Sequence, residues 1–232
     1  MKMTSTLIAA GLLAGTFSVA QAGPMSVFDL KTDDGSAQLF TDTENEGDFY
    51  DRGASFASLT DTDGDSDSAG AFLLFEFAGY ANLNDFGIYN PNDISQTLQV
   101  FDGTDSTETN ENSQVRFDLT AGTAATRYGT ANIGTTFGFY LQRNQNIFYS
   151  DASMNTGGTD MTRIFDVSES WNSQFHTSSL IVAFEDLIAG DFDYNDLVVG
   201  ISDVRAVPEP GTLALVGLGL LGLGMARRRK SA

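Results

Sequence analysis

The apolar segments of this chain are short, and residues that favour turns separate them. Between residues 23 and 206 no segment keeps a helical period over three turns, and Gly, Asp, Asn, Thr or Ser bounds each apolar run. Short runs with such boundaries are typical of all-β proteins. We therefore predict an all-β fold, as a single β-sandwich or jelly-roll-like domain. The predicted strands are 26–30, 38–40, 54–59, 71–77, 85–89, 97–101, 114–119, 135–142, 146–150, 162–167, 179–185 and 197–204.

Aromatic residues are numerous, with 18 Phe and 7 Tyr in the whole chain. We expect most of them to form the core of the sandwich, because aromatic side chains bury large apolar areas. Two segments, Phe-Gly-Ile-Tyr at 86–89 and Phe-Gly-Phe-Tyr at 137–140, share one pattern, and polar turn residues follow each of them. An aromatic surface that stacks on sugars is the alternative interpretation.

The first 22 residues predict a secretory signal peptide. Lys2 supplies the positive start, residues 7–20 form an uncharged and mostly apolar run, and Ala20 and Ala22 supply the small residues of a cleavage site. This order is typical of a chain that the secretion machinery exports and signal peptidase cuts, here before Gly23. An ordinary N-terminal helix is the alternative.

A second signal closes the chain. Pro208, Glu209 and Pro210 are followed by the apolar run 213–226, and then by a basic cluster of Arg227, Arg228, Arg229 and Lys230. At about 1.5 Å per residue the apolar run spans about 21 Å, which is short of the roughly 30 Å of a membrane's hydrocarbon core. Basic residues beside a membrane segment stay on the cytoplasmic side. The pattern predicts a short membrane helix that anchors an exported body transiently.

This order of Pro-Glu-Pro, short apolar run and arginines resembles the PEP-CTERM sorting signal. The resemblance implies recognition by an exosortase-type transpeptidase, and a Gram-negative host that makes exopolysaccharide. It also implies a final location at the cell surface or outside the cell. A plain single-span tail anchor is the alternative. We expect three parts: a signal peptide at 1–22, a β-sandwich at 23–206, and a sorting tail at 207–230.

The body between the two signals is strongly acidic. Of the 12 Lys and Arg residues five lie in the signals, which leaves seven, and of the 31 Asp and Glu residues only Glu209 lies there, which leaves 30. A body with a net charge near −23 excludes binding to nucleic acid, which is itself a polyanion. Divalent cations are its natural small partners. The chain has no cysteine, so thiolate-based metal sites are excluded.

The sharpest motif of the body is an acidic turn between two apolar strands at 181–201. Asp191, Asp193 and Asn195 have the 1,3,5 spacing of a calcium loop, and calcium prefers six to eight oxygen ligands. We predict a calcium site on a β-hairpin, and its candidate ligands are Glu185, Asp186, Asp191, Asp193, Asn195 and Asp196. Turn chemistry, with Asp and Asn capping a tight loop, is the alternative. The segment Phe-Glu-Asp…Asp-Phe-Asp-Tyr-Asn-Asp also resembles the closing hairpin of an uncharacterised β-rich domain family of exported bacterial proteins.

Two other acidic segments are weaker candidates. Asp61, Asp63, Asp65 and Asp67 alternate as in calcium loops, but Ala69 stands where a ligand belongs, so a solvated turn is the preferred interpretation. The residues Asp42, Glu44, Glu46, Asp48 and Asp51 predict a solvated face.

Catalytic patterns are missing from the sequence. His176 is the only histidine, and no Gly-x-Ser-x-Gly elbow lies near it. We therefore predict no catalytic residue, and a non-enzymatic protein of the cell surface or of an exopolysaccharide-containing matrix. A carbohydrate-binding or adhesive module is the first alternative. A secreted glycan-active enzyme is the second, because abundant carboxylates leave open an acidic pair.

Overall fold

The structure is a computed structural model of the 232-residue chain, and it describes residues 26–27, 38–41, 47–51, 53–60, 68–75, 83–104, 112–167, 179–188, 190 and 192–207. Within these ranges the chain forms mainly strands, with the 3₁₀ turns η4 (Ala152–Met154) and η5 (Thr156–Gly158) between residues 149 and 162. The predicted all-β class is confirmed. The predicted signal peptide and the sorting tail from Pro208 onward lie outside the described residues.

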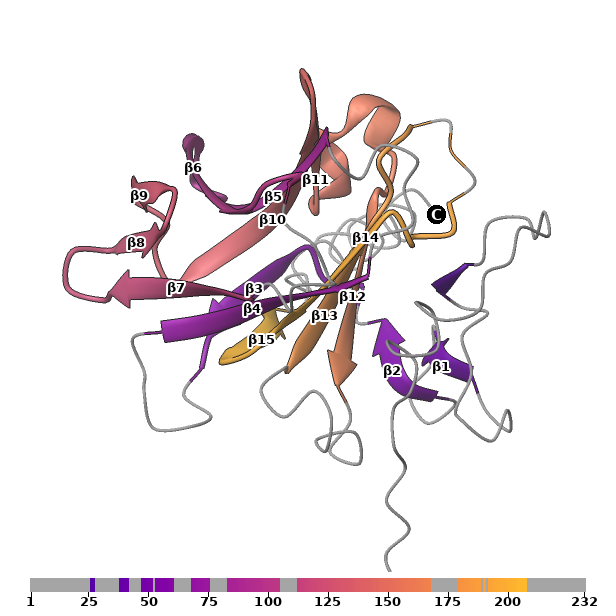
Figure 1. Ribbon diagram of the computed structural model, residues 1–232, viewed down its shortest axis with the longest axis horizontal. Helices are drawn as coiled ribbons and strands as arrows, with labels where there is room; N and C mark the ends of the chain where they lie inside the picture. The colour runs from indigo at the N-terminus through magenta and orange to yellow at the C-terminus, as the bar shows by residue number, and fades with distance from the viewer. Residues whose placement is uncertain are drawn as a thin grey trace, which may run out of the picture.

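The strands belong to two sheets, and Figure 1 labels their strands. The larger sheet has the order β1-β2-β12-β13-β14-β4-β7-β8-β9. Its strands are β1 (Gln38–Thr41), β2 (Gly47–Asp51), β4 (Ser68–Phe75), β7 (Asn112–Asp118), β8 (Thr123–Thr126), β9 (Gly129–Ala131), β12 (Thr162–Val167), β13 (Leu180–Phe184) and β14 (Leu197–Ile201). Strands β1 and β2 pair in parallel, and the other pairs of this sheet are antiparallel.

The smaller sheet has the order β15-β3-β10-β5-β6, and β11 pairs with the end of β10. Its strands are β3 (Phe56–Leu59), β5 (Asn84–Asn90), β6 (Asp93–Phe101), β10 (Thr136–Arg143), β11 (Asn146–Tyr149) and β15 (Val204–Val207). All its pairs are antiparallel. The final strand, β15, therefore lies at one edge of this sheet.

The core lies between the two sheets and is largely aromatic. Phe86 of the smaller sheet meets Phe184 of the larger one edge-on, with ring centroids 6.2 Å apart. Phe137 stacks on Phe117 across the same space, at 5.5 Å. These contacts confirm the expectation that phenylalanine fills a sandwich core. Burying such rings is the main source of stability for a body without disulfides.

The two Phe-Gly-apolar-Tyr segments pair with each other. They lie on β5 and β10, where Gly138 is the Cα partner of Tyr89 and Tyr140 is the Cα partner of Gly87. The phenylalanines point into the core, so the glycines and tyrosines of these strands face the other side of the sheet. Each tyrosine ring lies over the opposite glycine: a Cβ on Gly87 would sit 2.5 Å from the Tyr140 ring, and Tyr89 fills the same space at Gly138. The shared pattern therefore encodes a reciprocal Tyr-over-Gly pair.

Most predicted strands are present, and the structure differs from the strand prediction in three respects. The predicted strand 197–204 is two strands, because Ser202 and Asp203 form a turn between β14 and β15, with Asp203 at a φ of 59°. The turn moves the chain from the larger sheet to the smaller one. Strands β2, β8 and β9 were not predicted, since they are short and polar. Of the predicted strand 26–30 only Ser26 and Val27 are described, and neither lies in a strand.

Candidate functional site: the acidic loop between β13 and β14

The loop between β13 and β14 carries the predicted acidic motif. Phe184 and Leu197 are Cα partners, so the loop runs from 185 to 196. Four of its polar residues are buried, with exposed fractions of 0% for Glu185, 2% for Asp186, 6% for Asp193 and 4% for Asn195. Burial of acidic groups is costly unless hydrogen bonds or opposite charges compensate it. The partners of these side chains therefore decide what the loop does. Asp191 lies outside the described residues.

Asp186 forms a buried ion pair with Arg143 at the end of β10. The Arg143 guanidinium lies 2.9 Å from Asp186 Oδ1, and the two side chains are 13% and 2% exposed. The Asn84 side-chain amide donates to Asp186 Oδ2 at 3.2 Å, from the start of β5. The carboxylate therefore ties the loop to two strands of the opposite sheet. An arginine at this distance also opposes a second cation at Asp186.

Two carboxylates bind backbone N–H groups inside the loop. Glu185 Oε1 accepts from the N–H of Tyr194 at 3.0 Å, and Asp196 Oδ2 accepts from the N–H of Asp186 at 2.9 Å. Gly190 leaves room for Glu185, because a Cβ at position 190 would lie 2.5 Å from Glu185 Oε2. Charge-assisted hydrogen bonds of this kind are among the stronger ones in proteins. The first and last acidic residues of the motif thus close the loop on itself.

Asp193 and Asn195 form a local turn. Asp193 Oδ1 accepts from the N–H of Asn195 at 3.2 Å, and Oδ2 accepts from its side-chain amide at 2.7 Å. The carbonyl of Asp193 also accepts from the N–H of Val27 at 2.8 Å and from the hydroxyl of Ser26 at 3.3 Å. Asp side chains commonly bond a backbone group two residues on. The loop thereby holds Ser26 and Val27, which lie near the N-terminus of the body, by two hydrogen bonds.

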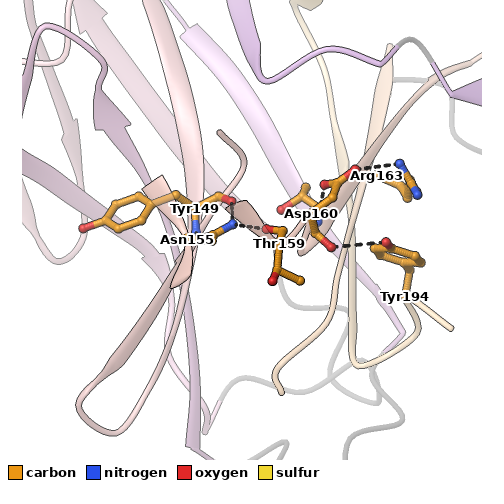
Figure 2. A network of polar contacts seen from close by, with 7 residues as sticks. Tyr149, Asn155, Thr159, Asp160, Arg163 and Tyr194 are labelled. Atoms are coloured by element: carbon orange, nitrogen blue, oxygen red, sulfur yellow. Dashed lines mark hydrogen bonds and ion pairs between the residues drawn. The ribbon is translucent and has the colours of Figure 1, made fainter. Parts of the chain in front are cut away.

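Tyr194 attaches the loop to the segment that follows η5 (Figure 2). Its hydroxyl donates to the carbonyl of Asp160 at 3.2 Å, and the Arg163 guanidinium lies 4.8 Å from its ring centroid. Arg163 in turn pairs with Asp160 at 2.7 Å. In the same view the side-chain amide of Asn155 donates to the carbonyls of Tyr149 and Thr159. Tyr194 adopts a φ of 55°, which side-chain anchoring compensates.

The described oxygen atoms of the loop do not converge as a calcium site requires. Among the described residues no three His, Cys, Asp or Glu side chains are grouped so that they could hold a metal ion. The carboxylates of Asp186 and Asp196 instead bind protein donors. Calcium binds oxygen ligands, and Asp191, one of the predicted ligands, lies outside the described residues. The predicted calcium site therefore stays a prediction.

The loop also exposes apolar side chains, which the sequence motif did not point to. Leu187, Ile188 and Phe192 are 41%, 39% and 40% exposed, and Phe192 has a φ of 55°. We refer to these three exposed residues of the loop as its tip. Exposed apolar residues beside a polar rim are a feature of interaction surfaces. The apolar residues between the acidic ones in the sequence are the signal that could have indicated this tip.

The tyrosines of the Tyr-over-Gly pair form a second group of buried polar side chains. Tyr89 is fully buried and meets Tyr149 edge-on at 5.1 Å. Burial raises the pKa of Tyr89 to about 12, and it raises the pKa of Tyr140 and of Tyr149 as well. For Tyr140 the nearby Asp85 carboxylate adds to the effect of burial. Tyr89 and Tyr140 are buried, so these two rings offer no open platform for a sugar ring.

The other predicted site residues lie outside the described part of the chain. They are the weaker metal ligands Asp61, Asp63, Asp65 and Asp67, the histidine His176, and the sorting residues Ala20, Ala22, Pro208, Glu209, Pro210, Arg227, Arg228 and Arg229. Of the acidic run at 42–51, Asp48 and Asp51 lie in β2.

Comparison with protein families identifies the C-terminal segment. Residues 206–230 match the PEP-CTERM protein-sorting motif. Such a motif marks an exported protein of Gram-negative bacteria that an exosortase sorts, so the predicted tail is confirmed as a PEP-CTERM sorting signal. No curated protein matches the chain, and no solved structure matches it. No helix in the described ranges is long and apolar enough to cross a membrane, and the apolar run 213–226 lies outside these ranges.

Proposed function

We propose that the chain is a non-enzymatic β-sandwich protein of the cell surface or of the extracellular matrix. The sorting motif at 206–230 is the observation that carries this proposal. An exosortase releases the body from the short membrane segment, and the body then remains with surface material such as exopolysaccharide. The acidity of the body fits this environment, because a net charge near −23 keeps the protein soluble and apart from nucleic acid.

Intact-mass measurement of the surface-associated protein tests the proposal. We expect two cuts, one after Ala22 and one in the region of Pro208 to Pro210. A product that still carries the basic cluster from Arg227 to Lys230 would contradict sorting and would indicate a plain tail anchor. An Arg227→Ala, Arg228→Ala, Arg229→Ala variant serves as a comparison, since it removes the basic part of the signal and should accumulate uncut.

The way in which the loop uses its acidic groups supports the proposal of a non-enzymatic protein. Asp186 is paired with a cation, while Glu185 and Asp196 bind backbone N–H groups. Each carboxylate therefore has a structural partner. We expect His176→Ala to leave the thermal stability of the body unchanged and to abolish no hydrolytic activity. Loss of a measured activity in a fully folded His176→Ala protein would overturn the non-enzymatic proposal.

An adhesive or carbohydrate-binding module is the second candidate. The exposed tip of Leu187, Ile188 and Phe192 is the observation that favours it. Binding of the body to exopolysaccharide from the host should then weaken when Phe192 is replaced by Ser. Leu119→Ser is a matched control, because Leu119 is 51% exposed in the turn between β7 and β8. Equal binding by both variants and by the unchanged protein would exclude the tip.

A further inference from the structure

The sorting motif begins inside the folded sheet. The motif covers 206–230 and β15 covers Val204–Val207, so Ala206 and Val207 belong to both. Their Cα partners are Ala57 and Phe56 of β3. Pro208 follows Val207 directly in the sequence. The expected cleavage region at 208–210 therefore comes immediately after a paired strand, with no linker between them.

β15 is attached to the body by its side chains as well as by its pairing with β3. Val204 is 1% exposed and belongs to the core, and its N–H donates to Ser179 Oγ at 3.2 Å. The Ser179 hydroxyl also reaches the carbonyl of Val204. On the outer face Arg205 Nε lies 3.3 Å from Ser58 Oγ. The strand therefore has a defined docked state, from which it must separate as a unit.

A transpeptidase that cuts near Pro208 needs residues on both sides of the bond. Peptide-binding clefts hold their substrates in an extended form, with main-chain hydrogen bonds to the enzyme. The residues on the body side of the cut are those of β15, and β3 already occupies one edge of that strand. A cleft that encloses the chain from both edges can accept β15 only after it leaves β3. The folded sandwich then competes with the enzyme for the same four residues.

We propose that separation of β15 from β3 controls the sorting cut, so that the edge of the smaller sheet acts as a gate for exosortase. This inference rests on the proposed function, because it requires that the tail is cut at all. If an enzyme binds only the separated state, its apparent affinity for the chain falls in proportion to the fraction of molecules in that state. Edge strands open more readily than the rest of a sheet, so some folded molecules have β15 separated at any time. The cut is slow because this fraction is small.

An engineered disulfide across this edge tests the gate. Arg205 and Ser58 are antiparallel Cα partners, and the Cα spacing of such pairs lies within the range that disulfides span. The native chain has no cysteine, so Ser58→Cys with Arg205→Cys creates a single cross-link in the oxidising periplasm. The matched control is Gln142→Cys with Ile147→Cys, which cross-links β10 to β11 away from β15. Loss of the tail from the full-length chain is followed by mass in cells that carry the exosortase.

We expect the β15–β3 cross-link to slow tail removal by about tenfold or more. The control cross-link should leave the rate unchanged, and addition of a reductant should restore cutting of the locked variant. An insertion of five residues, all Gly or Ser, between Val207 and Pro208 should restore cutting even when the disulfide is formed. The insertion supplies the enzyme with an unpaired segment. Ser179→Ala, which loosens Val204, should speed the cut about two- to threefold by raising the separated fraction.

The outcomes separate this inference from the proposed function. Cutting of the oxidised locked variant at the unmodified rate would overturn the gate while leaving exosortase sorting intact. Retention of the tail by the unmodified chain and by the control pair alike would instead contradict the sorting proposal. A third outcome would also overturn the gate: a reductant restores tail removal in the locked variant, but the inserted segment does not. This result would show that the cross-link does not act by limiting the access of the enzyme to the chain.

Discussion

The Tyr-over-Gly pair and the acidic loop are held together in opposite ways. On β5 and β10, which are paired strands, the rings of Tyr89 and Tyr140 fill the space above two glycines, so close packing is the main constraint. In the loop, Glu185 and Asp186 are fixed by charged hydrogen bonds to Tyr194 N–H and to Arg143. A packed pair of this type is sensitive to added volume, whereas a buried charged network is sensitive to the loss of one partner. The two regions should therefore respond to different perturbations.

The largest effect should come from breaking the buried ion pair. Asp186→Ala removes the partner of the Arg143 guanidinium and the acceptor of the Asn84 amide. We expect a loss of about 3–5 kcal/mol in the free energy of unfolding, because a buried charge loses its compensation. Chemical denaturation of the body measures this loss.

An exposed pair provides the control for the ion-pair experiment. Asp160 and Arg163 are 43% and 29% exposed, so Asp160→Ala should cost no more than about 1 kcal/mol. Arg143→Met combined with Asp186→Leu should recover much of the lost stability, since it removes both charges. Equal costs for Asp186→Ala and Asp160→Ala would contradict the importance of burial at Asp186.

The Tyr-over-Gly pair should be broken by a single methyl group. A Cβ at Gly87 would lie 2.5 Å from both the carbonyl oxygen of Leu98 and the Tyr140 ring. We expect Gly87→Ala to cost about 3 kcal/mol, because the backbone of β6 cannot yield easily. At Gly138 the three atoms nearest to an added Cβ all belong to the Tyr89 side chain, so Gly138→Ala should cost less, and Tyr89→Leu should partly rescue it. Thermal unfolding distinguishes the three variants, and a neutral Gly87→Ala would refute the close approach.

High pH should destabilise the Tyr-over-Gly pair before it affects the acidic loop. Burial raises the pKa of Tyr89 to about 12, above its ordinary value of 10, so the folded state favours the protonated hydroxyl. Its contribution is complete below pH 10 and is lost as the pH rises through about 12. The loss is on the order of 3 kcal/mol for a shift of about two pKa units. Unfolding curves measured from pH 8 to about 12 should show this decline, and Tyr89→Phe should reduce it.

Calcium should act on the loop and not on the tyrosine pair. At about ten times its dissociation constant, an ion bound only to the folded state adds about 1.4 kcal/mol. The midpoint of thermal unfolding should then rise by about 3–6 °C for a body of this size. We expect Asp191→Ala with Asp193→Ala to remove most of this gain, and changes at Asp63 and Asp65 to remove less. Equal shifts with magnesium, or an unchanged gain in the double variant, would contradict a calcium site in the loop.

The smallest effect concerns the two aromatic residues of the loop that have a positive φ. Phe192 is exposed and Tyr194 is anchored by Asp160 and Arg163. Phe192→Gly should stabilise the body by about 1 kcal/mol, because it relieves a left-handed conformation. Tyr194→Gly should destabilise it, since the loss of its anchors outweighs that relief. Denaturant midpoints of the two variants test whether the anchors matter.

Local sequence patterns predicted most of the fold. Short apolar runs placed β5, β10, β12 and β13 within one or two residues of their observed ends, because alternation and turn residues are local signals. The same signals failed where a strand is short and polar, as in β8 and β9, which owe their pairing to neighbouring strands. They also missed the turn at Ser202 and Asp203, which apolar residues flank on both sides.

The sequence by itself determined the class of the fold, the acidic character of the body and the PEP-CTERM tail, because composition and a linear motif carry this information. Only the tertiary structure decided the partners of the motif residues. Arg143 lies 43 residues from Asp186, and Asn84 lies 102 residues from it. Such partners meet only when β5 and β10 of one sheet approach the loop of the other. Likewise, the pairing of β15 with β3 places the first residues of the sorting motif in a sheet, because strands distant in the sequence become neighbours only on folding.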